Sequence, residues 1–218
     1  MIKALIFDLD DTLVSSSPLH KKAFGVALKK YKVDVYKITK TQEKNLMGRT
    51  LADVARLLIE YLDVNVSVET LLAEREKAIL KILPTVKAMP GFSVLKKFLQ
   101  KTELKKAVAT STYKRYADFI LKKFKLQDIF QVIITADQIT KSKPDPQIFL
   151  LAAKKLKIKP KDCLVIEDAD NGIKAAKAAG MKVIAVRNSL FSTGQSLKGA
   201  DQIANDLSEV EKKIKLLN

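Results

Sequence analysis

Residues 4–12 read ALIFDLDDT, in which four apolar residues lead into three carboxylates within four positions. The apolar run has the length and character of a buried parallel strand, which would place Asp8 at the strand's carboxyl end. Asp10 follows two positions later and can face the same way, because side chains alternate along an extended chain. Parallel sheets bind ligands at this edge, so the stretch predicts both an α/β fold and the place of its site.

Similar apolar segments that end in polar residues recur along the chain and predict further strands. With the first, these segments cover residues 4–8, 107–110, 132–135, 163–167 and 182–186, with a shorter one near Ile203. Apolar residues repeat every three to four positions between most of them, as in helices that pack on a sheet. The predicted helices are residues 94–99, 116–124, 147–156 and 173–179. Such alternation favours a Rossmann-like parallel sheet.

The first gap differs, because about 75 residues separate the first strand from the next helix and strand. No segment in this gap has the pattern of a strand. Its amphipathic stretches, residues 19–31, 51–62 and 68–83, suggest a small bundle of helices. Serines and prolines flank the gap and suit a linker. We therefore expect a core of residues 1–14 and 89–218 with an inserted helical cap of residues 15–88.

Charge and composition narrow the class of protein. The net charge is +16, with +6 in residues 15–88 and +10 in the rest, so no basic tail stands out. Nucleic-acid modules usually concentrate Lys and Arg and add aromatic residues, which here make up only 6%. No apolar run approaches the roughly 20 residues of a membrane span, and no export signal is apparent. The single Cys163 lies in a segment that is predicted to be a buried strand. Because one cysteine cannot form an internal disulfide, we expect a cytoplasmic protein.

The two carboxylates Asp8 and Asp10 can divide one reaction between them. One can attack phosphorus to form an aspartyl phosphate, while the other protonates the leaving oxygen and later activates water. Taken alone, the pattern could equally be a turn rich in Asp and Thr.

Other polar residues at later strand ends favour the reaction over the turn. Thr110 and Ser111 follow one strand and can hold phosphoryl oxygens, although they could also only cap a helix. Lys143 precedes a proline-started helix, where its ammonium can offset negative charge, although most lysines are solvated. Glu167 and Asp168 close another strand and offer the hard oxygens that Mg²⁺ prefers.

These four motifs, in this order, resemble those of the haloacid dehalogenase superfamily. The resemblance covers essentially the whole chain and is closest to the branch with a helical cap, which includes β-phosphoglucomutase and phosphoglycolate-phosphatase-like enzymes. It implies a Rossmann-like core and a mobile cap. It also implies Mg²⁺ as the cofactor.

The resemblance further implies a role for each matching residue. Asp8 would be the nucleophile and a metal ligand, and Asp10 the acid/base that also offers its carbonyl oxygen to the metal. Lys143 would balance charge. The remaining roles are phosphate binding by Thr110 and the Ser111 amide, and metal binding by Asp168 and, directly or through water, by Glu167.

Residues of the cap decide between a phosphatase and a mutase. Leu51 stands where the β-phosphoglucomutase form carries an Arg that grips phosphate, and Arg49 lies two residues earlier. Glu74 and Glu76 occupy a stretch where the mutase uses a lysine. The lone His20 could gate Asp10 or orient substrate, although a single histidine on a helix is more often packing or surface. His20 and Arg49 are thus candidate substrate-binding residues.

We therefore expect an Mg²⁺-dependent phosphatase that hydrolyses a small phosphorylated metabolite, with a β-phosphoglucomutase-like sugar-phosphate mutase as the alternative. The phosphotransfer acid/base Asp10 argues against dehalogenation. A basic binding module with a vestigial acidic pocket would leave the motifs unexplained. The expected protein is a monomer without a nucleic-acid or membrane partner.

Overall fold

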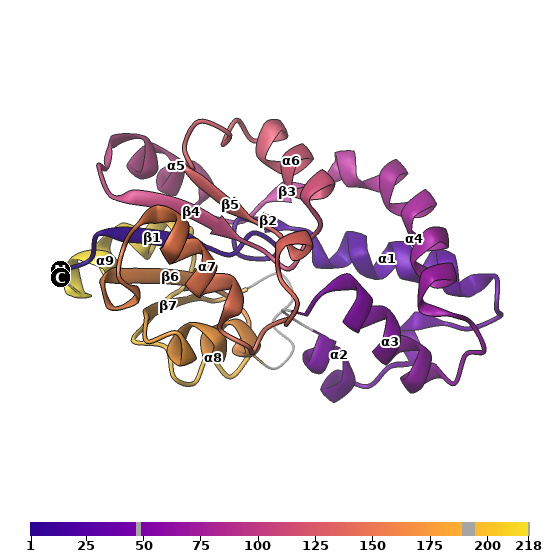
Figure 1. Cartoon of the computed structure of the whole chain (residues 1–218). Helices are drawn as coiled ribbons and strands as arrows, with labels where there is room; N and C mark the ends of the chain where they lie inside the picture. The colour runs from indigo at the N-terminus through magenta and orange to yellow at the C-terminus, as the bar shows by residue number, and fades with distance from the viewer. Residues whose placement is uncertain (47–48, 189–194, 218) are drawn as a thin grey trace.

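A computed structural model, which describes residues 1–46, 49–188 and 195–217, shows a six-stranded parallel sheet between two layers of helices (Figure 1). The strand order is β5-β4-β1-β6-β7-β8, so the first strand lies at the centre. The strands are β1 Ala4–Phe7, β4 Lys105–Ala109, β5 Val132–Ile134, β6 Cys163–Glu167, β7 Lys182–Val186 and β8 Gln202–Ala204. The predicted α/β class is confirmed, and each predicted strand is present.

Alternate residues of the strands face two separate cores. In β1, Ala4 and Ile6 belong to one buried cluster and Leu5 and Phe7 to the other. Helices α7 (Gln147–Leu156) and α8 (Asp170–Ala178) cover the first face. The other face carries α5 Phe92–Lys101, α6 Lys114–Lys123 and α9 Val210–Leu217. Both faces are apolar, which explains why the strands appear in the sequence as continuous apolar runs.

The long gap after β1 folds into helices that gather beyond the carboxyl edge of the sheet (Figure 1). They are α1 Ser17–Lys29, α2 Lys40–Leu46, α3 Leu51–Leu62 and α4 Val68–Ile82. Both α1 and α3 pack against α4. Helix α2 buries none of its residues, which explains why its sequence lacks a clear apolar face and predicted no helix.

Two short strands join the helical part to the sheet, and here the sequence-based expectation was wrong. Val14–Ser15 (β2) pairs antiparallel with Lys87–Ala88 (β3), although no strand was predicted between residues 8 and 107. Each strand has only two residues, which is too few to show an alternating pattern. This two-stranded ribbon of β2 and β3 places the point where the chain leaves the sheet next to the point where it returns.

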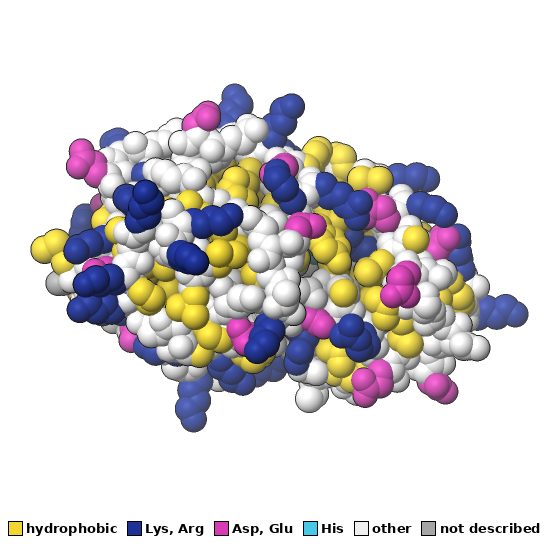
Figure 2. All heavy atoms as spheres, viewed as in Figure 1, with side chains coloured by type: hydrophobic (Ala, Val, Ile, Leu, Met, Phe, Trp, Pro, Cys, Tyr) yellow, Lys and Arg dark blue, Asp and Glu magenta, His cyan; other side chains and the backbone are white. Residues whose placement is uncertain are grey.

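The surface carries the net positive charge in a dispersed form. Figure 2 shows Lys and Arg side chains scattered over both the sheet part and the helical part of the visible face, interleaved with acidic and apolar ones. Within the described ranges, every helix is too short or too polar to cross a bilayer.

Candidate active site

The sheet topology brings the predicted motifs to one edge. Strand β1 lies between β4 and β6, and Phe7 is in register with both Val108 and Ile166. The backbone N–H of Asp8 continues the ladder by donating to the carbonyl oxygen of Ile166 at 3.0 Å. The chain winds outward from β1 in one direction and from β6 in the other. Such a switch point is where open α/β sheets bind ligands.

A fully buried lysine links the first and last motifs. The Nζ of Lys143 donates to Oδ1 of Asp8 at 2.6 Å and to Oε1 of Glu167 at 2.7 Å. Burial disfavours the charge of Lys143, but the carboxylates of Asp8 and Glu167 outweigh it and raise the lysine's pKa. Lys143 is therefore a fixed cation that holds the Asp8 carboxylate from behind.

Glu167 is held rigidly by the start of helix α8. Its Oε2 accepts the backbone N–H groups of Asp168 and Ala169, both at 2.7 Å. A Cβ atom at position 172 would lie 1.7 Å from Oε1 of Glu167, so Gly172 makes room for the carboxylate. Gly172 could not be singled out from the sequence, because its role depends on where the Glu167 side chain of another element lies.

Carboxylates outnumber cations at this edge. Burial, followed by the charges of neighbouring acids that include Glu167, raises the pKa of Asp168 well above its usual range. Burial also raises the pKa of Asp8 well above its usual range, despite the opposing effect of Lys143. Oδ1 of Asp168 accepts a hydrogen bond from Thr12 at 2.9 Å. Thr12 therefore ties the first motif to the last.

Asp10 faces the opening of the site and has a different environment. Its Oδ1 accepts from the Ser16 hydroxyl at 2.5 Å and its Oδ2 from the Thr110 hydroxyl at 3.0 Å. Burial tends to raise the pKa of Asp10, but hydrogen bonds, the first of them from His20, lower it on balance. The two carboxylates of the motif thus have pKa values shifted in opposite directions, as acid/base pairs in active sites often do.

Asp11 has a structural role next to these two. Its backbone adopts a φ of 60°, a left-handed conformation that Asp tolerates better than most residues. Its Oδ1 accepts the backbone N–H groups of Ser16 and Ser17, both at 3.1 Å. These are donors at the start of α1, so Asp11 caps the first helix beyond the sheet and orients it over the site.

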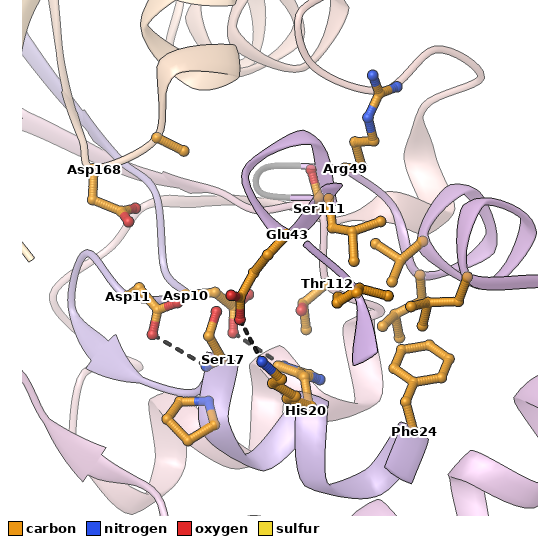
Figure 3. A pocket seen from close by; sticks show the side chains of 18 of the residues that line it. Asp10, Asp11, Ser17, His20, Phe24, Glu43, Arg49, Ser111, Thr112 and Asp168 are labelled. Atoms are coloured by element: carbon orange, nitrogen blue, oxygen red, sulfur yellow. Dashed lines mark hydrogen bonds and ion pairs between the residues drawn. The ribbon is translucent and has the colours of Figure 1, made fainter. Parts of the chain in front are cut away.

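A cavity of about 400 Å³ lies between this edge and helices α1, α2 and α3. Figure 3 shows Asp10, Asp11 and Asp168 on one side of it and Phe24 on the other. Ser111 and Thr112, which follow β4, also contribute to its wall. Thr110 and Lys143 lie behind Asp10 and Asp8 and contact those carboxylates instead.

His20 connects Asp10 to a buried arginine that sequence reasoning missed. The Nε2 of His20 lies 3.5 Å from Oδ1 of Asp10, and its Nδ1 is hydrogen-bonded to the guanidinium of Arg75. Arg75 is only 1% exposed and lies between the rings of Phe24 and Tyr116. Burial lowers the pKa of Arg75 to about 10, which still leaves it charged at neutral pH.

Arg49 lines the cavity but is engaged elsewhere. Its Nε donates to the carbonyl oxygen of Asn45 at 2.7 Å and its Nη2 to the Asn45 side chain at 2.9 Å. In Figure 3 its guanidinium points away from the acidic residues. Leu51, the first residue of α3, also lines the cavity.

The donor set suits a hard divalent cation. Asp8 and Asp168 are buried with raised pKa values, and a cation between them would favour their charged forms. Among the described residues, no three side chains of His, Cys, Asp or Glu form a ready-made metal centre. The two buried carboxylates Asp8 and Asp168 fit Mg²⁺, which is usually held by one or two carboxylates and completes its shell with water and substrate oxygens.

The chain has clear relatives among known proteins. A family model described as haloacid dehalogenase-like hydrolase matches residues 5–186. The chain is 31% identical over 207 residues to a phosphorylated carbohydrates phosphatase of Thermotoga maritima, with 93% of each covered. It is 33% identical over 184 residues to a fructose-1-phosphate phosphatase of Escherichia coli, with 84% of this chain and 95% of the relative covered. A solved structure from T. maritima, described as a candidate β-phosphoglucomutase, has a TM-score of 0.74, 28% identity and full coverage of both chains.

Proposed function

The chain belongs to the haloacid dehalogenase-like hydrolases and is a phosphohydrolase, and from that premise we propose that it hydrolyses a small phosphorylated metabolite with Mg²⁺ through an aspartyl phosphate on Asp8. The observation that carries the proposal is the pairing of Asp8 with a buried Lys143, next to a second carboxylate, Asp10, that faces the cavity. Residues 15–88 would form the cap over this site.

The first step transfers the phosphoryl group to Asp8. A carboxylate oxygen of Asp8 forms a bond to phosphorus while the bond between phosphorus and the ester oxygen breaks. Lys143 favours the charged form of Asp8 against the effect of burial and holds its carboxylate in place. The leaving oxygen takes a proton from Asp10. The phosphate brings negative charge beside Asp10, which raises the pKa of Asp10 in the complex and allows it to carry that proton.

The second step returns the enzyme to its starting state. Asp10, now charged, accepts a proton from water while the water oxygen attacks phosphorus, and the bond to Asp8 breaks. His20, Ser16 and Thr110 hold the Asp10 carboxylate in one orientation during both steps. The products are the alcohol and inorganic phosphate.

Mg²⁺ would be held by Asp8, Asp168 and the carbonyl oxygen of Asp10, with Glu167 supporting the site through Lys143 and the backbone of α8. It supplies positive charge that stabilises the transferring phosphoryl oxygens. Family members in general use this ion, and the carboxylate excess at the sheet edge agrees with it.

Trapping of the phosphorylated enzyme tests the proposal. Acid quenching during turnover of a ³²P-labelled ester should leave label on the protein, and hydroxylamine should release it, because acyl phosphates react with this reagent. Asp8→Asn should retain no label. Label that resists hydroxylamine, or that persists in Asp8→Asn, would contradict an aspartyl phosphate at this position.

A mutase is the second candidate, favoured by the likeness to the T. maritima structure. A mutase must hold a bisphosphate intermediate by its second phosphate while the intermediate turns round. Leu51 offers no charge for that purpose, and Arg49 is bonded to Asn45. Both observations support hydrolysis as the main activity.

A further inference from the structure

The half of the cavity away from the carboxylates is lined mainly by apolar side chains. They come from α1, α2, α3 and the segment between α1 and α2, and they are Phe24, Val35, Ile38, Leu46, Leu51, Val54 and Leu58. This wall is continuous with Asp8 and Asp10, so it faces the organic group of any ester whose phosphate reaches Asp8.

Three polar side chains that line the cavity, Lys21, Arg49 and His20, already have partners within the protein. Lys21 is paired with Glu43 at 2.7 Å and lies over the ring of Tyr36. Arg49 is bonded to Asn45. His20 contacts Arg75 and Asp10. A substrate hydroxyl that lies against the apolar side chains would find no partner there, and Lys21, Arg49 and His20 are held in their present positions by the bonds just described.

We propose that the organic group of the substrate is apolar, an aliphatic or aromatic alcohol with few hydroxyls, and that this apolar wall selects it over polyols and sugars. The inference rests on the proposed phosphatase activity and adds the class of the leaving group. An apolar body gains by leaving water for the wall, whereas a polyol must give up hydrogen bonds to water that the wall does not replace.

A matched pair of esters tests this selection. Cyclohexyl phosphate and myo-inositol 1-phosphate share a six-membered carbon ring and differ in five hydroxyls. We expect kcat/KM with Mg²⁺ to be at least tenfold higher for cyclohexyl phosphate. The more acidic inositol hydroxyl is the better leaving group, so chemistry alone would favour the other ester. Acetyl phosphate, whose small leaving group barely reaches the wall, is the substrate that reports phosphatase activity by itself.

Substitutions in the wall test its contribution. Val54→Asn places an amide in the wall and should lower the ratio of the two kcat/KM values at least threefold, and Leu46→Asn provides the same test from α2. Val26→Asn is the matched control, because Val26 lies on α1, is 51% exposed and is not part of the wall. It should leave the ratio unchanged.

The outcomes separate the two proposals. Hydrolysis of acetyl phosphate together with equal or better use of the inositol ester would overturn the apolar selection and leave the phosphatase standing. A ratio that Val54→Asn and Leu46→Asn both leave unchanged would also overturn the assignment to this wall. Failure to hydrolyse acetyl phosphate with Mg²⁺ would overturn the phosphatase itself, and the selection with it.

Discussion

The guanidinium of Arg75 contacts Nδ1 of His20, and this contact fixes which nitrogen of the imidazole carries the proton. Arginine can only donate, so Nδ1 must accept. The proton of the neutral ring then sits on Nε2, which is the nitrogen 3.5 Å from Asp10. A residue of helix α4 thereby sets the hydrogen bonding of a carboxylate at the edge of the sheet.

Replacement of Arg75 by Met should lower activity while the fold is kept. Met has a similar length and can fill the space between Phe24 and Tyr116, but it leaves Nδ1 of His20 and the hydroxyl of Tyr116 without the donor that Arg75 supplies. We expect the free energy of unfolding to fall by about 1–3 kcal/mol, while kcat falls about tenfold because either nitrogen of His20 can then be protonated.

The control is Arg115→Met on α6, a 59% exposed arginine that pairs with Glu76. It should keep the wild-type kcat and pH profile. An unchanged kcat and pH profile in Arg75→Met would show that Arg75 only fills space. Arg75→Lys, which retains a donor, should recover part of the activity.

Asp8→Asn should abolish turnover. The amide neither attacks phosphorus nor carries the charge that Lys143 and a metal ion would neutralise. Asp137→Asn, the same change at an exposed acid just after β5, should leave kcat within about twofold. Retention of more than about a tenth of the wild-type kcat in Asp8→Asn, equivalent to only ~1.4 kcal/mol in the barrier, would rule out Asp8 as nucleophile.

Removal of divalent ions with EDTA should silence the enzyme, and added Mg²⁺ should restore it. The reason is the crowding of Asp8, Asp168 and Glu167, which need more positive charge than Lys143 provides. Ca²⁺ should restore little, because its larger and more flexible shell can draw a carboxylate into bidentate binding and out of line for attack. Full activity in metal-free buffer would refute the assignment of Glu167 and Asp168 to a metal site.

The stability of the metal-free protein should depend on pH through the same acids. The pKa values of Asp8 and Asp168 are raised on folding, so the folded state binds more protons than the unfolded chain above pH 3.8. The contribution of these two groups to stability is therefore lost as pH rises through their folded pKa values. Mg²⁺ should offset that loss, and the rise in Tm on adding Mg²⁺ should be larger at pH 8 than at pH 5.5.

Thermal unfolding with and without Mg²⁺ checks this difference, and Asp168→Asn is the informative variant because it removes one of the two titrating groups. The variant should show a smaller Mg²⁺ effect at pH 8. An Mg²⁺ effect independent of pH would mean that neither acid takes up a proton in the metal-free protein.

Phosphatase and mutase activities can be separated with β-glucose 1-phosphate and a catalytic amount of β-glucose 1,6-bisphosphate. We expect phosphate release or no reaction, with little glucose 6-phosphate. The bisphosphate must stay bound while it turns round, and each missing charge-assisted contact weakens its retention by about 1.5–3 kcal/mol. Rapid formation of glucose 6-phosphate that disappears in Arg49→Ala would show that Arg49 leaves Asn45 and that the protein is a mutase.

The parts of the site that lie at strand ends could be predicted from the sequence. Asp8, Thr110 and Asp168 each follow an apolar run, and the order of a parallel sheet brings such positions together. The role of Lys143 could be predicted from its motif. Its complete burial and its bonds to both Asp8 and Glu167 could not, because they depend on how α7 packs. The residues of helices α1 to α4 were less predictable, because no strand pairing fixes their positions.

Arg75 shows why part of the site was missed. The sequence drew attention to the acids on either side of it, but Glu74 pairs with Lys30 and Lys77, and Glu76 with Arg115. A signal was available: Arg75 lies four positions after Leu71 and four before Ile79, on the buried face of α4. A charged residue on an apolar helix face predicts a buried partner, although not which one.

The ribbon of β2 and β3 has a consequence for how such a protein can change. Ser15 and Lys87 are paired across it, so the two ends of the helical segment lie about 5 Å apart, the spacing of neighbouring strands. The whole segment between Ser15 and Lys87 therefore leaves the sheet and returns to it at one place. Helices there can be exchanged, lengthened or deleted without rerouting a strand or disturbing the register that holds Asp8 beside Lys143. Replacement of this helical segment can thus change which substrates fit, while Asp8 and Lys143 stay in place.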